Sequence, residues 1–132
     1  MTQSIYDNGR LVASVSEDDL IWAKIAHLSA ILAMIVSATS LSFLGPLVIW
    51  GLKKDSSTYV RSAAAESFNF NIGMWVMNAI GWILTFTLIL APVGIPLIIA
   101  SFVLTLWHHL KAFGAVNRHE QYHYPFQISV LS

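Results

Sequence analysis

The chain has 132 residues, of which 56% are hydrophobic and 11% are charged, and its formal net charge is zero. A soluble domain of this length could not cover so much apolar surface with so few charges, and a neutral chain lacks the positive charge that attracts nucleic acid. Because cysteine is absent, disulfides, thiolate zinc sites and thiol catalysis are excluded, and we expect an integral membrane protein.

Residues 1–19 predict a flexible cytoplasmic arm, because they are polar and lack the basic start and apolar core of a cleavable signal peptide. Ser16 and Asp19 have capping-box spacing, which predicts a helix start at the end of this arm. From Leu20 the chain is apolar for about 19 residues, interrupted by Lys24, His27 and Ser29, and roughly 20 residues span the hydrocarbon core. This segment is the first predicted membrane span.

A short second helix is predicted after the turn TSLS. Pro46 suits the first turn of this helix, and the apolar part from Leu41 to Leu52 would be about 18 Å long. A helix of that length spans a thinned region, tilts little or is re-entrant.

The third predicted helix is long, with Ser57 as its N-cap; its first third would lie near the interface and residues 68–90 would form a span. The turn APVGIP follows, and Pro96 is predicted to begin the fourth helix. Residues 20–118 would thus be a transmembrane domain, and 119–132 a cytoplasmic tail.

The basic residues favour a topology of two helical hairpins with both termini in the cytoplasm. Arg10, Lys24, the 53–61 loop and the end of the fourth helix carry the Lys and Arg residues, which collect on the cytoplasmic side. Trp22, Trp50 and Trp107 fall near the same side, as an aromatic belt would. The predicted fold is an all-α, integral membrane four-helix bundle with a short second and a long third helix.

Polar residues at membrane depth are the candidates for function. Ser62, Glu66, Asn69 and Gly73 share one helical face, and Ser67, Asn71, Asn78 and Thr85 form a second stripe. These stripes could line a pathway for ions, protons or peptide, or they could be hydrogen-bonding glue between helices, which we favour. The candidate polar face comprises Ser62, Glu66, Asn69, Asn71, Asn78 and His27.

His27 could pair with Glu66 across the bundle, although a structural hydrogen bond is the expected role. Lys53, Lys54 and Arg61 form a candidate interfacial basic cluster. Attraction to anionic lipid is one explanation for this cluster, and topology alone is another.

The stretch HEQYH at 119–123 has the two-histidine spacing of zinc proteases. Pro125 ends the helix at this motif, and the nine residues YPFQISVLS that follow His123 offer no further His, Asp, Glu or Cys ligand. We therefore predict no catalytic residue, no metal site and no cofactor, and we interpret HEQYH as a helix end at the cytoplasmic interface.

The order of several short motifs resembles one bacterial family. These motifs are Trp22, HLS at 27–29, LGPL at 44–47, W-x-x-K-K-D at 50–55, V-R at 60–61, E-x-F-N-F at 66–70 and YP at 124–125. The family is the domain-of-unknown-function family forty-eight seventy, whose small four-helix membrane proteins are similar to the twenty-kilodalton subunit of the chloroplast Tic import translocon. The resemblance implies a location in the bacterial inner membrane, several membrane passes and no enzyme activity. Members often have histidine after the V-R pair, whereas this chain has Ser62.

Two functions are expected from these observations. The first is a non-enzymatic component of a membrane assembly. Such a component would contact the lipid bilayer and either membrane protein partners or copies of itself. The resemblance implies Tic-like protein translocation as its role. The alternative is a small oligomeric transporter or channel that uses the polar face around Glu66.

Overall fold

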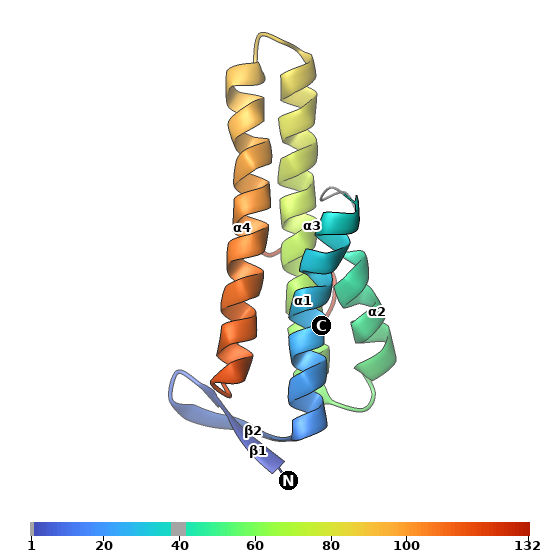
Figure 1. Ribbon diagram of the computed structural model, residues 1–132, viewed down its shortest axis with the longest axis vertical. Coiled ribbons are helices and arrows are strands. Elements are labelled where there is room, and N and C mark those ends of the chain that lie inside the picture. Colours follow the sequence, from blue (N-terminus) through green and yellow to red (C-terminus); the bar gives the residue numbers. More distant parts are fainter. Residues whose placement is uncertain (1, 38–41) are drawn as a thin grey trace.

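The computed structural model describes residues 2–37 and 42–132, and in them a β-hairpin precedes four helices (Figure 1). The elements are β1 (Thr2–Asp7), β2 (Arg10–Ser16), α1 (Glu17–Ser37), α2 (Leu44–Lys53), α3 (Thr58–Phe86) and α4 (Ala91–Asn117). The predicted turn at 39–42 lies outside the described residues except for Ser42.

The N-terminal hairpin occupies the stretch for which a flexible arm is expected. Its strands pair antiparallel around Asn8 and Gly9, whose φ angles of 48° and 79° are those of a two-residue type I′ turn. Ile5 is fully buried in a small cluster with Val15 and Val116. Two backbone hydrogen bonds, from Tyr6 to His119 and from Gln121 to Tyr6, join β1 to the chain after α4.

Side-chain caps explain where two of the helices begin. At α1 the backbone N–H of Asp19 donates to Ser16 Oγ, and the N–H of Ser16 donates to Asp19 Oδ2, which together form a capping box. Ser57 accepts from the N–H of Val60 at the start of α3. By contrast α4 begins at Ala91, five residues before the predicted start at Pro96, because Pro92 already suits the first turn.

The helices α3 and α4 form a long antiparallel pair that extends well beyond α1 and α2 (Figure 1). Near the far end of this pair the two backbones approach closely. A Cβ atom at Gly81 would lie 2.9 Å from the carbonyl oxygen of Gly94, so both positions need glycine. The helices α1 and α2 cover α3 near the β-hairpin, and within residues 2–37 and 42–132 they do not extend to the far part of the α3–α4 pair (Figure 1).

The prediction of an all-α, integral membrane four-helix bundle is wrong. The structure adds a two-stranded sheet, and among the described residues one helix, α4, is long and apolar enough to cross a membrane. With 10 residues, α2 reaches about 15 Å. The long α3 carries Arg61, Glu66 and three asparagines, which lower its hydropathy. The predicted boundaries of the transmembrane domain, at residues 20 and 118, stay predictions. The cytoplasmic location of both chain termini also stays a prediction.

Candidate functional site

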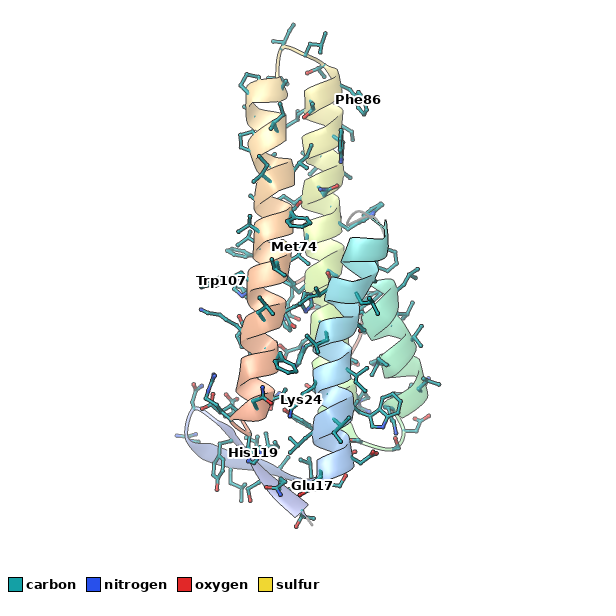
Figure 2. The ribbon with its side chains drawn as sticks, in the orientation of Figure 1. Glu17, Lys24, Met74, Phe86, Trp107 and His119 are labelled. Atoms are coloured by element: carbon teal, nitrogen blue, oxygen red, sulfur yellow. The ribbon has the colours of Figure 1, made fainter. Side chains whose placement is uncertain are left out.

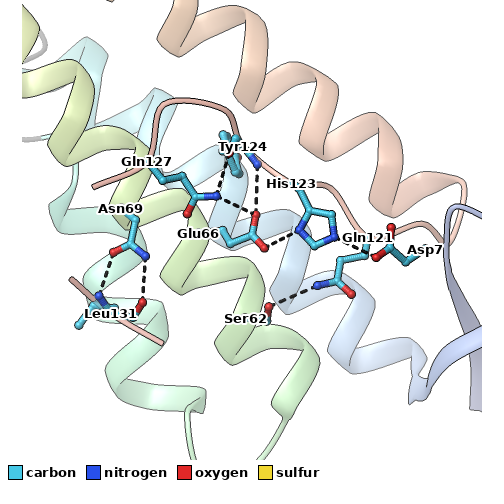
Figure 3. Close-up of polar contacts among 9 residues, drawn as sticks. All are labelled: Asp7, Ser62, Glu66, Asn69, Gln121, His123, Tyr124, Gln127 and Leu131. Atoms are coloured by element: carbon cyan, nitrogen blue, oxygen red, sulfur yellow. Dashed lines mark hydrogen bonds and ion pairs between the residues drawn. The ribbon is translucent and has the colours of Figure 1, made fainter. Parts of the chain in front are cut away.

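The first polar stripe of α3 is covered by the last residues of the same chain (Figure 3). We call residues 119–132 the C-terminal strap. Glu66 accepts hydrogen bonds from the backbone N–H of Tyr124 at 3.1 Å and from Gln127 Nε2 at 3.4 Å. Its other oxygen lies 2.8 Å from His123 Nδ1. Both oxygens of this carboxylate are therefore engaged by the strap.

Asn69 and Ser62 bind the strap on either side of Glu66 along α3 (Figure 3). Asn69 Oδ1 accepts from the N–H groups of Val130 and Leu131, and its Nδ2 donates to the Leu131 carbonyl, each at 2.9 Å. Gln121 donates to Ser62 Oγ at 3.4 Å. The three hydrogen bonds of Asn69 form a three-point contact with the backbone of the strap. Such a contact holds the strap in place whatever side chains the strap carries at those positions.

His123 joins three parts of the chain. Its Nδ1 faces Glu66 of α3, and its Nε2 lies 3.0 Å from Asp7 Oδ2 at the end of β1. Partial burial lowers the pKa of His123, but hydrogen bonds to Asp7 and Glu66, together with the two negative charges, outweigh this effect and raise the pKa above 6.5. When it is protonated, the ring forms ion pairs with Asp7 and Glu66 and so joins the hairpin, α3 and the strap.

The second polar stripe of α3 faces α4. Asn71 donates to the ring of His109 at 2.7 Å and to the Ser67 carbonyl at 2.7 Å, and Asn78 donates to Ser101 Oγ at 2.9 Å. The contacts of Asn71 with His109 and of Asn78 with Ser101 join α3 to α4. Small polar side chains commonly hydrogen-bond across the interface between two apolar helices.

A buried hydrogen-bonded chain links the two stripes. The hydroxyl of Tyr124 lies 2.8 Å from His27 Nδ1 and 2.8 Å from His109 Nδ1. All three side chains are almost fully buried. His27 is thus paired with Tyr124 of the strap rather than with Glu66, the other partner that the sequence allows.

The basic residues predicted as a cluster lie at the end of α2 and the start of α3. Lys53 Nζ lies 4.2 Å from the ring centroid of Trp22 and 4.0 Å from Asp18, and Lys54 Nζ lies 4.8 Å from the ring centroid of Trp50. Arg61 is exposed in the first turn of α3. Each lysine thus lies within the distance at which a cation is attracted to the face of a tryptophan ring.

The two histidines of the HEQYH stretch make different contacts. The helix α4 ends at Asn117, and His119 has a φ of 58°, so its two histidines do not follow one another on a helix. The carbonyl of His119 accepts one backbone hydrogen bond from Tyr6 of β1, while both ring nitrogens of His123 face carboxylates. Among the described residues no three His, Asp or Glu side chains are placed to hold a metal ion.

Sequence reasoning found Ser62, Glu66 and Asn69, which hold the strap, but it missed the strap itself and the residues through which the strap binds. Tyr124, His109 and His123 lie in segments that suggested a helix end and a tail, and their partners are far away in the chain. One local signal was available: Asn-Gly between alternating residues at 8–9 is typical of a β-hairpin.

One comparison with known proteins gives a match. The model of the magnetosome magnetite crystal formation protein family matches residues 18–131. No curated protein and no solved structure matches the chain.

The expected resemblance to family forty-eight seventy and to the Tic subunit is therefore wrong, and Tic-like protein transport loses its support. The motifs that suggested it are short: Pro46 of LGPL lies in the first turn of α2, and His27 of HLS hydrogen-bonds to Tyr124.

Proposed function

Because the chain belongs to the magnetosome magnetite crystal formation protein family, we propose that it is a non-enzymatic membrane component of the assembly that forms the crystals. In this proposal the unshielded part of the α3–α4 pair enters the bilayer. The β-hairpin, the α2–α3 turn and the strap form a polar end at the membrane surface.

The observation that carries the proposal is the exposure of the far α3–α4 pair. In α4, 22% of the most apolar stretch is buried, whereas the core helix of a soluble protein would be mostly buried. Around the turn between the helices Phe86, Leu88 and Ile89 are 77%, 81% and 88% exposed. Exposed apolar surface on this scale needs a partner, and lipid is the partner that suits an uncharged helix pair.

The distribution of charge supports the same orientation. No Asp, Glu, Lys or Arg occurs between Glu66 and Lys111, a stretch that contains the whole far part of the pair. The charged residues lie towards the end that carries the β-hairpin, and the labelled Glu17 and Lys24 lie there (Figure 2). A chain divided in this way lowers its free energy by placing one end in lipid and the other in water.

The use of the polar side chains supports a structural rather than a catalytic role. The side chains of Glu66, Asn69 and His123 are engaged by other parts of the chain, as expected for residues that hold a fold together. The alternative, a transporter that uses the face around Glu66, would need that face to be open. Here the strap lies on it.

The experiment is a gene deletion in a magnetosome-forming bacterium, complemented with wild-type and variant chains. Ile83→Asp/Ile99→Asp places two charges on the exposed far part of α3 and α4, at roughly 2.5–3.5 kcal/mol each in a bilayer centre. We expect this variant to leave the membrane fraction and to fail to restore crystal size, measured by electron microscopy.

Leu11→Asp is the matched control, because Leu11 is 63% exposed on β2 at the polar end. It should remain in the membrane fraction and restore the crystals. Crystals unchanged by the deletion would contradict the role in crystal formation. Membrane retention of the Ile83→Asp/Ile99→Asp variant would contradict the anchoring.

A further inference from the structure

A groove of about 500 Å³ runs along one face of α4 where the apolar stretch meets the charged end. It is lined by Trp107, Leu110, Lys111, Gly114, Arg118 and Tyr122. Trp107, Lys111, Gly114 and Arg118 follow one another at spacings of three and four, so they share one face of the helix, and Leu110 lies beside Lys111 at the edge of this face. Trp107 projects away from the bundle (Figure 2).

Two cations lie at the polar end of this groove. Lys111 Nζ lies 5.3 Å from the ring centroid of Trp107. Glu120 accepts from Nε and pairs with Nη2 of Arg118, while Nη1 of the same guanidinium lies near Gly114. With Lys111, Arg118 and Glu120 together the groove carries an excess of one positive charge.

The walls of the groove are held in place by the protein itself. Tyr122 comes from the strap, and its hydroxyl hydrogen-bonds to His108 Nδ1. Gly114 has no side chain, and a Cβ there would lie 3.3 Å from Arg118 Nη1. The space beside the two cations thus depends on glycine at this position.

Above the groove the same face of α4 is apolar. Ile99, Val103 and Trp107 follow one another at a spacing of four and are 58%, 54% and 57% exposed. A ligand with its anionic group between Lys111 and Arg118 would therefore have an apolar track of several turns beside it. This combination of a charged pocket and a long apolar track fits a phospholipid.

We propose that this groove binds one anionic phospholipid, with the headgroup phosphate at Lys111 and Arg118 and an acyl chain along Val103 and Ile99. The proposal rests on the proposed membrane anchoring and adds a specific lipid to it. A free phosphate could use the two cations, but it would leave the apolar track uncovered.

The test is native mass spectrometry of the full chain in detergent with added phosphatidylglycerol or phosphatidylcholine. We expect wild type to retain phosphatidylglycerol preferentially and Lys111→Gln/Arg118→Gln to lose roughly fivefold in affinity for each cation removed. Lys24→Gln is the matched control, because Lys24 also lies over an aromatic ring, that of Phe113, but does not line the groove. It should bind as wild type does.

Gly114→Leu is a second variant that keeps both charges and places a good helix former in the helix. We expect it to fill the groove and to lose the lipid as well. Equal losses in Lys24→Gln and the double variant, or no loss in either, would overturn the proposal. Displacement of phosphatidylglycerol by glycerol 3-phosphate would overturn it in favour of a free phosphate site.

Vesicle flotation separates this proposal from the proposed function. A chain that floats with phosphatidylcholine and phosphatidylglycerol vesicles alike supports the anchoring, and the absence of a preference for phosphatidylglycerol in the mass spectra of that same chain would then overturn the lipid groove alone. A chain that floats with neither would overturn both.

Discussion

Glu66 and His123 are 57 residues apart in the chain, yet their side chains form an ion pair of 2.8 Å. The contact fastens the C-terminal strap to the middle of α3, and Asp7 on the other ring nitrogen fastens the β-hairpin to the same point. The polar face of α3 thus organises the water-facing end of the molecule. Three predictions test this arrangement, and a fourth tests the packing of the far end.

The strap should loosen as the pH rises through the titration of His123. Since the pKa of His123 is raised in the folded chain above 6.5, its stabilising effect is complete below that ordinary value and is lost as the pH passes the raised one. Hydrogen exchange at the amide of Tyr124, which donates to Glu66, should therefore become faster, after correction for the intrinsic rate, as the pH rises above 6.5 and through the raised pKa of His123.

His123→Gln should remove this pH dependence, because glutamine does not titrate. His119→Asn is the matched control from the same motif, and asparagine accepts the φ of 58° at that position. An identical pH profile in wild type and His123→Gln would show that another group controls the strap.

Replacing Asn69 by alanine should release the end of the strap. The side chain makes three hydrogen bonds of 2.9 Å to the backbone of Val130 and Leu131, and each is worth about 1 kcal/mol. Limited proteolysis after Phe126 should become markedly faster. Asn78→Ala breaks a contact between α3 and α4 instead, so it should leave this cleavage rate unchanged. Equal rates in the Asn69 variant and wild type would contradict the three-point contact.

Local signals predicted much of the helical part of the fold and less of the site. Ser16, Ser57 and Pro46 mark helix starts through short-range capping and φ preferences, which sequence spacing captures. Helical spacing likewise predicts that Ser62, Glu66 and Asn69 share a face.

The partners of that face could not be predicted, because they belong to a segment without periodicity that returns from the far end of the chain. The membrane-bundle prediction failed for a related reason. Hydropathy measures whether a residue tolerates lipid, and it does not tell whether a helix is covered by its neighbours. The β-hairpin, by contrast, had a usable signal in Asn8 and Gly9.

Gly81→Ala should separate the far ends of α3 and α4. The added Cβ would lie 2.8 Å from Ile98 Cγ1 and 2.9 Å from the Gly94 carbonyl oxygen, and overpacking of this kind costs about 1–3 kcal/mol. Gly51→Ala in α2 is the control, since its Cβ would meet nothing within 4 Å and alanine favours a helix. Thermal unfolding in detergent should show a lower midpoint for the first and an equal or higher one for the second. A Gly81 variant as stable as wild type would show that the two helices can move apart without loss.

Tyr124→Phe should destabilise the buried chain that joins the strap to α1 and α4. The hydroxyl contacts His27 Nδ1 and His109 Nδ1, each at 2.8 Å, and its removal leaves two buried ring nitrogens without this partner. Leaving such a group unsatisfied costs about 1–3 kcal/mol, so the loss should far exceed that of one exposed hydroxyl. The free energy of unfolding from denaturant titration measures this difference, with Tyr6→Phe as the control because Tyr6 is 42% exposed on β1. Equal stability of the two variants would mean that His27 and His109 find other partners, and the strap would then be held by Glu66 and Asn69 instead.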